Sequence, residues 1–76
     1  MDKDVVRTNA VSIWILINST QDYYYWTYKE LKEKTQMSDR ELNMAIGWLA
    51  RENNIEIGSD SQTGEERFFV SMRFYF

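Results

Sequence analysis

Apolar side chains recur at helical spacing in three stretches of the chain and alternate with polar ones toward its end. The first stretch follows Thr8 or Asn9, either of which can cap a helix, and stops at a polar cluster over residues 18–22. Its apolar residues are three and four positions apart: Ala10, Ile13, Trp14 and Ile17. The isoleucines at 13, 15 and 17 would also suit a strand. The preceding apolar positions, Val6 and Ala10, favour a helix.

Two capping boxes predict the second and third helices. Each has Ser or Thr followed three residues later by Glu, at 27–30 (Thr-Tyr-Lys-Glu) and at 38–41 (Ser-Asp-Arg-Glu). The hydroxyl accepts a hydrogen bond from the backbone N–H of the third helical residue, and the carboxylate accepts one from the N–H of the cap. An apolar pair flanks each box: Trp26 with Leu31, and Met37 with Leu42. We expect helices over 28–35 and 39–53, with Asn53 or Asn54 as a left-handed stop.

Strand-like patterns occupy the remaining segments. The aromatic run 23–27 predicts a brief strand, and residues 55–57 and 67–76 predict the two strands of a hairpin around a polar turn at 58–66. Because side chains alternate along a strand, one face of the last strand should join the core: Phe68, Val70, Met72, Phe74 and Phe76. The other face should point outward: Arg67, Phe69, Ser71, Arg73 and Tyr75.

This order of elements is that of a winged helix-turn-helix, an α+β fold with three helices and a small antiparallel sheet whose C-terminal hairpin is the wing. A chain of 76 residues has room for one hydrophobic core. We therefore expect a single domain over 1–76, with an ordered core from about residue 6 onward.

Four short motifs in the predicted helices carry a family resemblance. They are Ile13-Trp14, Glu30-Leu31, Ser38-Asp39 and the string at 45–52, Ala-Ile-Gly-Trp-Leu-Ala-Arg-Glu. With them, most of the chain resembles a family of small bacterial winged helix-turn-helix proteins of unassigned function. The resemblance implies the winged-helix fold and a nucleic-acid-binding ancestry. It departs at Asn53-Asn54, where such proteins tend to carry a glycine and a basic residue.

The residue types that are missing exclude several classes of chemistry. The chain has no Cys and no His, which removes disulfides, zinc fingers, thiol chemistry and imidazole catalysis. It has neither a paired acidic motif nor a glycine-rich phosphate loop. Its longest fully apolar run, 13–17, is too short to span a membrane, and its acidic start is unlike a signal peptide. We expect a cytoplasmic protein that is not an enzyme and needs no cofactor or metal.

The third predicted helix offers a face that could read DNA. Its apolar side is Leu42, Ala45, Ile46 and Leu49, and the opposite side is Arg40, Asn43, Met44, Gly47 and Arg51. Arginine pairs with guanine and asparagine with adenine in the major groove. We therefore expect Arg40, Asn43 and Arg51 in the groove and Lys29 and Lys32 on phosphates, as in a transcriptional regulator that binds double-stranded DNA. An ordinary solvated helix face has a similar composition.

Gly47 has two interpretations in this helix. It would let the helix backbone approach DNA closely. It could equally be required for packing beneath a neighbouring aromatic, because a glycine inside a helix costs about 1 kcal/mol relative to alanine. The next residue, Trp48, is expected to belong to the core.

Charge favours a different partner. The net charge is −3, and the predicted wing carries Asp60, Glu65 and Glu66 with only Arg67 near its base, which opposes attraction to phosphates. The alternative function is a protein-interaction or dimerisation module that keeps the fold without binding DNA. Its interface would use the first helix, an outward aromatic sheet face that includes Phe69, Tyr75 and those tyrosines of 23–25 that point outward, or the end of the terminal strand at Phe76. Edge pairing of the terminal strand would give a homodimer, which either function can use.

Overall fold

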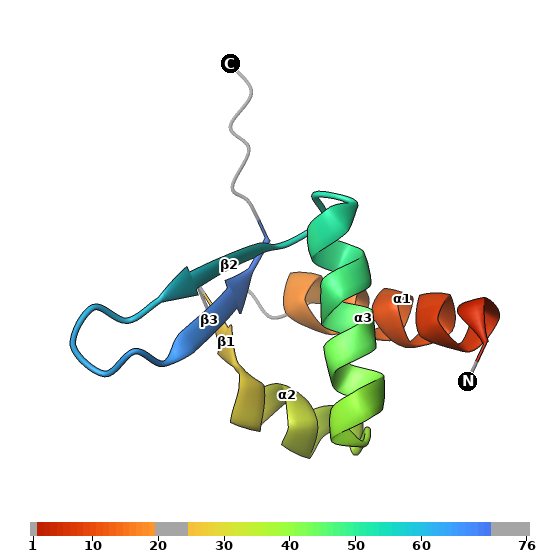
Figure 1. The fold of residues 1–76 in the computed structure, drawn as a ribbon, viewed down its shortest axis with the longest axis horizontal. Helices are drawn as coiled ribbons and strands as arrows, with labels where there is room; N and C mark the ends of the chain where they lie inside the picture. Colours follow the sequence, from red (N-terminus) through yellow and green to blue (C-terminus); the bar gives the residue numbers. More distant parts are fainter. Residues whose placement is uncertain (1, 20–24, 71–76) are drawn as a thin grey trace.

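The computed structural model describes residues 2–19 and 25–70. Its elements are α1 (Lys3–Ser19), β1 (Trp26–Thr27), α2 (Tyr28–Thr35), α3 (Asp39–Arg51), β2 (Glu56–Ser59) and β3 (Glu66–Phe69) (Figure 1). The strands form one antiparallel sheet in the order β1-β3-β2. Three helices with a three-stranded antiparallel sheet confirm the predicted α+β arrangement. No helix within the described ranges is long and apolar enough to cross a membrane.

Helix α1 begins at Lys3, so the predicted start at Thr8 or Asn9 is wrong. The carboxylate of Asp2 accepts a hydrogen bond from the N–H of Val5 at 3.0 Å, and its carbonyl accepts one from Val6 at 3.1 Å. Aspartate is a favoured capping residue, and Asp2 stabilises a helix start nearly two turns before the predicted one. The earlier start brings Val6 onto the buried face of the helix.

Both capping boxes form as predicted. The N–H of Thr27 donates to Glu30 at 2.9 Å, and the N–H of Glu30 donates to the Thr27 hydroxyl at 3.2 Å. The same pair of bonds joins Ser38 and Glu41 at 2.9 and 3.1 Å. Helix α2 therefore has the predicted bounds, and α3 begins where predicted but ends at Arg51, two residues early. Asn53 then takes the predicted left-handed conformation, with φ of 60°.

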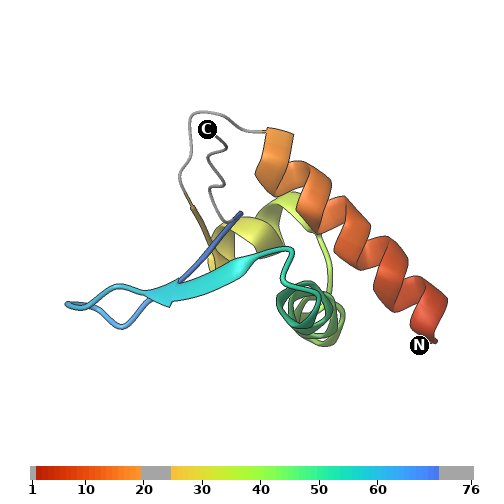
Figure 2. The ribbon, with the colours of Figure 1, turned by 90° about the horizontal axis from the view of Figure 1, so that it is seen from above.

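The core lies where α1 packs against α3 and where α2 contacts α3 and the strands β1 and β3 (Figure 2). The helices contribute their predicted apolar faces: Ala10, Ile13 and Ile17 from α1, Leu31 from α2, and Leu42, Ala45, Ile46 and Leu49 from α3. Trp26 of β1 lies opposite Phe68 of β3, and each is 2% exposed. This aromatic pair closes the core on the side of the sheet, and the hairpin loop between β2 and β3 projects beyond it as the wing (Figure 1).

The strands are shorter or shifted relative to the sequence prediction. Strand β1 has only two residues, and β2 covers 56–59 instead of 55–57. Strand β3 begins at 66, one residue before the predicted start, and ends at 69. Phe68 is buried and Val70 packs against the core, as predicted. Residues 23, 24 and 71–76 of the predicted strands lie outside the described residues. The polar turn is accordingly confined to 60–65.

The two boxes can be tested by removing their hydroxyls. We expect Thr27→Ala and Ser38→Ala each to lower the free energy of unfolding by about 1 kcal/mol, because a backbone N–H loses its acceptor. For a domain of this size, that loss corresponds to a fall of about 4–8 °C in melting temperature. Thermal unfolding followed by circular dichroism measures it. Ser61→Ala, in the exposed turn of the wing, is the matched control and should leave the melting temperature unchanged.

Candidate nucleic-acid interface

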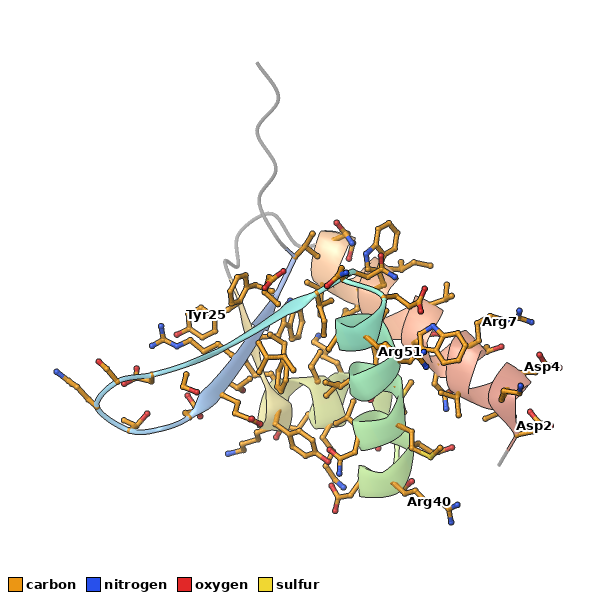
Figure 3. All side chains as sticks on the ribbon, turned by 45° about the horizontal axis from the view of Figure 1, so that its top comes forward. Asp2, Asp4, Arg7, Tyr25, Arg40 and Arg51 are labelled. Atoms are coloured by element: carbon orange, nitrogen blue, oxygen red, sulfur yellow. The ribbon has the colours of Figure 1, made fainter. Side chains whose placement is uncertain are left out.

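The side of α3 that faces away from the core is an uninterrupted exposed stripe. Its members are the residues predicted from the sequence, and all are exposed: Arg40, Asn43, Met44, Gly47 and Arg51. Arg40 and Arg51 are separated by about three helical turns, so they share this face at a distance of about 16 Å along the axis. Figure 3 shows them near opposite ends of α3. The stripe thus has a cationic group at each end.

Both arginines of the stripe are available to a ligand. Within the described part of the chain, the guanidinium groups of Arg40 and Arg51 form neither an ion pair nor a hydrogen bond. Each guanidinium carries five N–H donors arranged in a plane that matches base edges and phosphates. By contrast, Arg7 on α1 is paired with Asp4 at 3.0 Å.

Gly47 lies at the middle of the stripe with no neighbour that requires its small size. Among the described residues, apart from its two chain neighbours and the backbone of its own helix, a Cβ atom built on Gly47 would meet nothing within 4 Å. The interpretation that Gly47 is needed for packing beneath an aromatic side chain is therefore wrong. The adjacent Trp48 is partly buried and packs against the core, as expected. No contact in residues 2–19 and 25–70 accounts for a glycine at this position.

A side-chain network joins α2 to the first turn of α3. The ammonium of Lys32 donates to a carboxylate oxygen of Asp39 at 2.6 Å, and the hydroxyl of Tyr28 donates to the same oxygen at 2.9 Å. Lys32, predicted to bind phosphate, is thus engaged within the protein, whereas Lys29 is exposed. Sequence reasoning missed the roles of Tyr28 and Asp39, because residues seven and eleven positions apart on two different helices follow no periodic pattern.

The network also determines the charge at the start of α3. Hydrogen bonds from Lys32 and Tyr28 hold the pKa of Asp39 below its ordinary value. Burial, together with the neighbouring Asp39, raises the pKa of Tyr28, which keeps its hydroxyl protonated as a donor. Lys32 thereby offsets the charge of Asp39, the residue before Arg40. Lys29 and Lys32 also line a shallow depression of about 310 Å³ beside this junction.

The wing holds its own basic residue internally. Asp60 accepts hydrogen bonds from the backbone N–H groups of Gln62 and Thr63 at 2.7 and 3.0 Å, which lower the pKa of its carboxyl, and it also forms an ion pair with Arg67. The guanidinium of Arg67 lies 4.4 Å from the centre of the Tyr25 ring, within the range of a cation–π contact. In the wing, Glu65 and Glu66 are therefore exposed, whereas Arg67 is engaged by Asp60 and Tyr25.

Of the three residues predicted for an aromatic interface, the structure describes one. Phe69 is partly buried, and its ring lies over Gly58, where a Cβ atom would come within 3.3 Å of Cε1. Tyr75 and Phe76 lie outside the described residues. The ring of Phe69 thus covers its own sheet.

An apolar groove lies between α1 and the end of α3. It has a volume of about 360 Å³ and is lined by Ala10, Val11, Trp14, Trp48, Leu49 and Asn54. Val11 is 49% exposed and Ile15, one turn further along α1, is 55% exposed. Helix α1 therefore exposes large apolar side chains where an ordinary solvated helix has polar ones.

Comparisons with known proteins agree with this architecture. A family model described as "Winged helix-turn-helix domain (DUF2582)" matches residues 1–71. The chain is similar to the solution NMR structure of protein BT2368 from Bacteroides thetaiotaomicron, with 30% sequence identity and a TM-score of 0.76. That similarity covers 93% of this chain and 80% of the other. No curated protein matches the chain.

The network at the start of α3 predicts a pH-dependent contribution to stability. We expect Asp39→Asn to lower the melting temperature at pH 7, because the amide loses the ion pair with Lys32. Folding lowers the pKa of Asp39, so its stabilisation is complete well above its ordinary value of about 3.9 and is lost as the pH falls below that value. The difference in melting temperature between the two proteins should therefore stay constant down to about pH 5.5 and shrink toward pH 3.

Thermal unfolding followed by circular dichroism across this pH range makes the comparison. The control is Glu33→Gln, which removes an exposed carboxylate of α2 that forms no ion pair within the described residues. A difference between Asp39→Asn and the unmodified protein that persisted unchanged at pH 3 would show that the carboxylate charge is not the cause.

Proposed function

Because this chain belongs to the DUF2582 family of winged helix-turn-helix domains, we propose that it binds double-stranded DNA with the outward face of α3. Membership confirms the resemblance carried by the four sequence motifs. Domains with this fold are typically non-catalytic. They place the second helix of the helix-turn-helix, here α3, in the major groove. The observation that carries the proposal is the exposed stripe of α3, with an unpaired arginine at each end.

The stripe has the side chains needed to read base edges. Arg40 and Arg51 would each donate two hydrogen bonds to a guanine, and Asn43 would form two with an adenine. The major groove is about 12 Å wide and admits an α-helix, so the exposed face of α3 can approach base edges. Figure 3 shows that Arg40 and Arg51 extend from α3 and that Arg7 belongs to α1.

Helix α2 would position the protein on the phosphates. Lys29 is exposed on α2 and needs to break no contact to bind an anion. Lys32 already donates to Asp39, but its side chain is 42% exposed and an ammonium has three donors, so two remain. A phosphate near the start of α3 would therefore meet Lys32 without displacing Asp39.

The wing would stay away from the phosphates. Glu65 and Glu66 are exposed, while Arg67 is held by Asp60 and Tyr25. Contacts are then restricted to α2 and α3, and a net charge of −3 adds no long-range attraction. We accordingly expect modest affinity per domain.

We propose a cytoplasmic transcriptional regulator that acts as a homodimer on two half-sites.

Substitution of the arginines tests the proposal. We expect Arg40→Ala and Arg51→Ala each to weaken binding to a preferred duplex by about tenfold, because a bidentate base contact is worth about 1–3 kcal/mol. Lys29→Ala should weaken binding to all sequences alike and reduce the slope of log K against log salt by about 1. Fluorescence anisotropy of a labelled duplex, titrated at several salt concentrations, measures both effects.

Arg7→Ala is the matched control, because it removes the same charge from α1, away from the stripe. It should reduce affinity far less than Arg40→Ala does. If it weakens binding equally, the arginines act through overall charge and the assignment of α3 fails. Absence of binding to every duplex at about 50 mM salt would contradict DNA binding itself.

The apolar groove beside α1 favours a second candidate function. Soluble proteins rarely leave a cluster such as Val11, Trp14 and Ile15 uncovered without a partner. The second candidate is therefore a protein-interaction module that docks through α1, with another copy of this chain as the simplest partner.

Sedimentation tests whether α1 is the docking surface, and the DNA titrations above test separately whether the chain binds DNA. If α1 forms a dimer interface, the protein should sediment above the 9.2 kDa of one chain, and Ile15→Glu should restore the monomer because it buries an unpaired charge. Ile15 is 55% exposed, so the substitution should leave the monomer folded, which circular dichroism verifies. Glu33→Gln, on α2, is again the control and should sediment like the unmodified protein. A wild-type monomer at about 0.5 mM, far above the Kd expected of a stable interface, would argue against a dimer through α1.

A further inference from the structure

The middle of the α3 stripe is apolar, whereas both ends are basic. Met44 and Gly47 are one helical turn apart, and both are exposed. Met44 is 40% exposed, and its thioether side chain is flexible and unbranched. Arg40 precedes this pair by one turn and Arg51 follows it by one turn. The two residues therefore interrupt a row of hydrogen-bonding side chains with a segment that has none.

Gly47 is unfavourable for the isolated protein at this position. It lies inside a helix, where alanine is the more stable choice, and a Cβ atom there would meet nothing within 4 Å. Neither a positive φ nor a close neighbour accounts for it, since the positive-φ glycine of the described residues is Gly64. A glycine that the fold does not need leaves the helix backbone uncovered for something that approaches from outside.

We propose that Met44 and Gly47 receive the C5-methyl group of a thymine at the major-groove edge. The proposal rests on the DNA-binding function proposed above and names the base that the centre of α3 would read. The four bases present hydrogen-bonding groups to the major groove, and only thymine adds an apolar group. Met44 offers an apolar contact, and the missing Cβ of Gly47 leaves room for a methyl group against the backbone.

The position along the helix defines where this thymine lies. Gly47 is about 10 Å along the axis from Arg40 and about 6 Å from Arg51. The thymine should therefore fall between the bases that the two arginines reach. Asn43 projects from the same stretch of helix, which places an adenine contact beside the thymine contact and favours an A·T-rich centre.

The first part of the test removes the methyl group of thymine from the DNA. A preferred duplex is first selected from a randomised pool, and each thymine in it is then replaced by deoxyuridine, which lacks only the C5-methyl. We expect one central replacement to weaken binding of the wild-type protein about fourfold, the value for one buried methyl group. Anisotropy titrations with the full chain measure each affinity.

The complementary change is Gly47→Ala, which puts a methyl group in the space proposed for that of thymine. It should weaken binding to the thymine duplex about tenfold through overpacking. On the central deoxyuridine duplex it should bind as well as the wild-type protein does, because the two methyl groups no longer compete. The effect of Gly47→Ala should therefore depend on whether the thymine methyl group is present. A general loss of affinity would weaken binding to both duplexes alike.

Stability measurements separate binding from folding. Gly47→Ala should raise the melting temperature by about 4–8 °C, because alanine favours the helix and has room at this site. Ser12→Ala, at an exposed position inside α1, is the control and should bind both duplexes like the wild-type protein. A variant that is more stable and yet binds more weakly has lost a contact and not its fold.

Three results would overturn the inference while leaving DNA binding intact. They are selected sites without a central thymine, deoxyuridine replacements that change no affinity, and a Gly47→Ala variant that binds both duplexes equally weakly. Failure of the wild-type protein to bind any duplex in the pool would overturn the proposed function and this inference together.

Discussion

Burial of one face of α3 is the constraint on which the rest of the structure depends. Leu42 and Ala45 have no exposed surface, and Ile46 and Leu49 have almost none, because they belong to the core in which α1 packs against α3. A helix with one side held in this way has no freedom to rotate about its axis. The opposite side, from Arg40 to Arg51, is therefore presented to solvent in a single orientation. The composition of that side decides what the protein can bind.

Pairing of charges determines which basic groups remain available on this acidic chain. Asp60 and the Tyr25 ring hold Arg67, and Asp39 holds Lys32. The arginines of α3 have no such partners within the described residues. A net charge of −3 thus coexists with two unpaired arginines on one face of α3, because the printed ion pairs engage Arg67 of the wing and Lys32 of α2 and neither Arg40 nor Arg51.

Local signals predicted the helices better than the strands. The boxes at Thr27 and Ser38 gave correct starts for α2 and α3, because their hydrogen bonds join residues only three positions apart. The start of α1 was missed because Asp2 lies upstream of the apolar pattern used to find it. Strand bounds depend on pairing with residues distant in sequence, such as Trp26 with Phe68, so alternation alone placed β2 and β3 imprecisely.

The sequence by itself determined the order of elements, the buried faces of the helices and the members of the α3 stripe, because caps and periodicity act over a few residues. Only the tertiary structure decided which of these side chains have a partner and which have open space beside them. Lys32 is bound to Asp39, Arg67 is enclosed between Asp60 and Tyr25, and Gly47 has open space above it. The first two depend on contacts between separate elements and the third on their absence, neither of which a local pattern encodes.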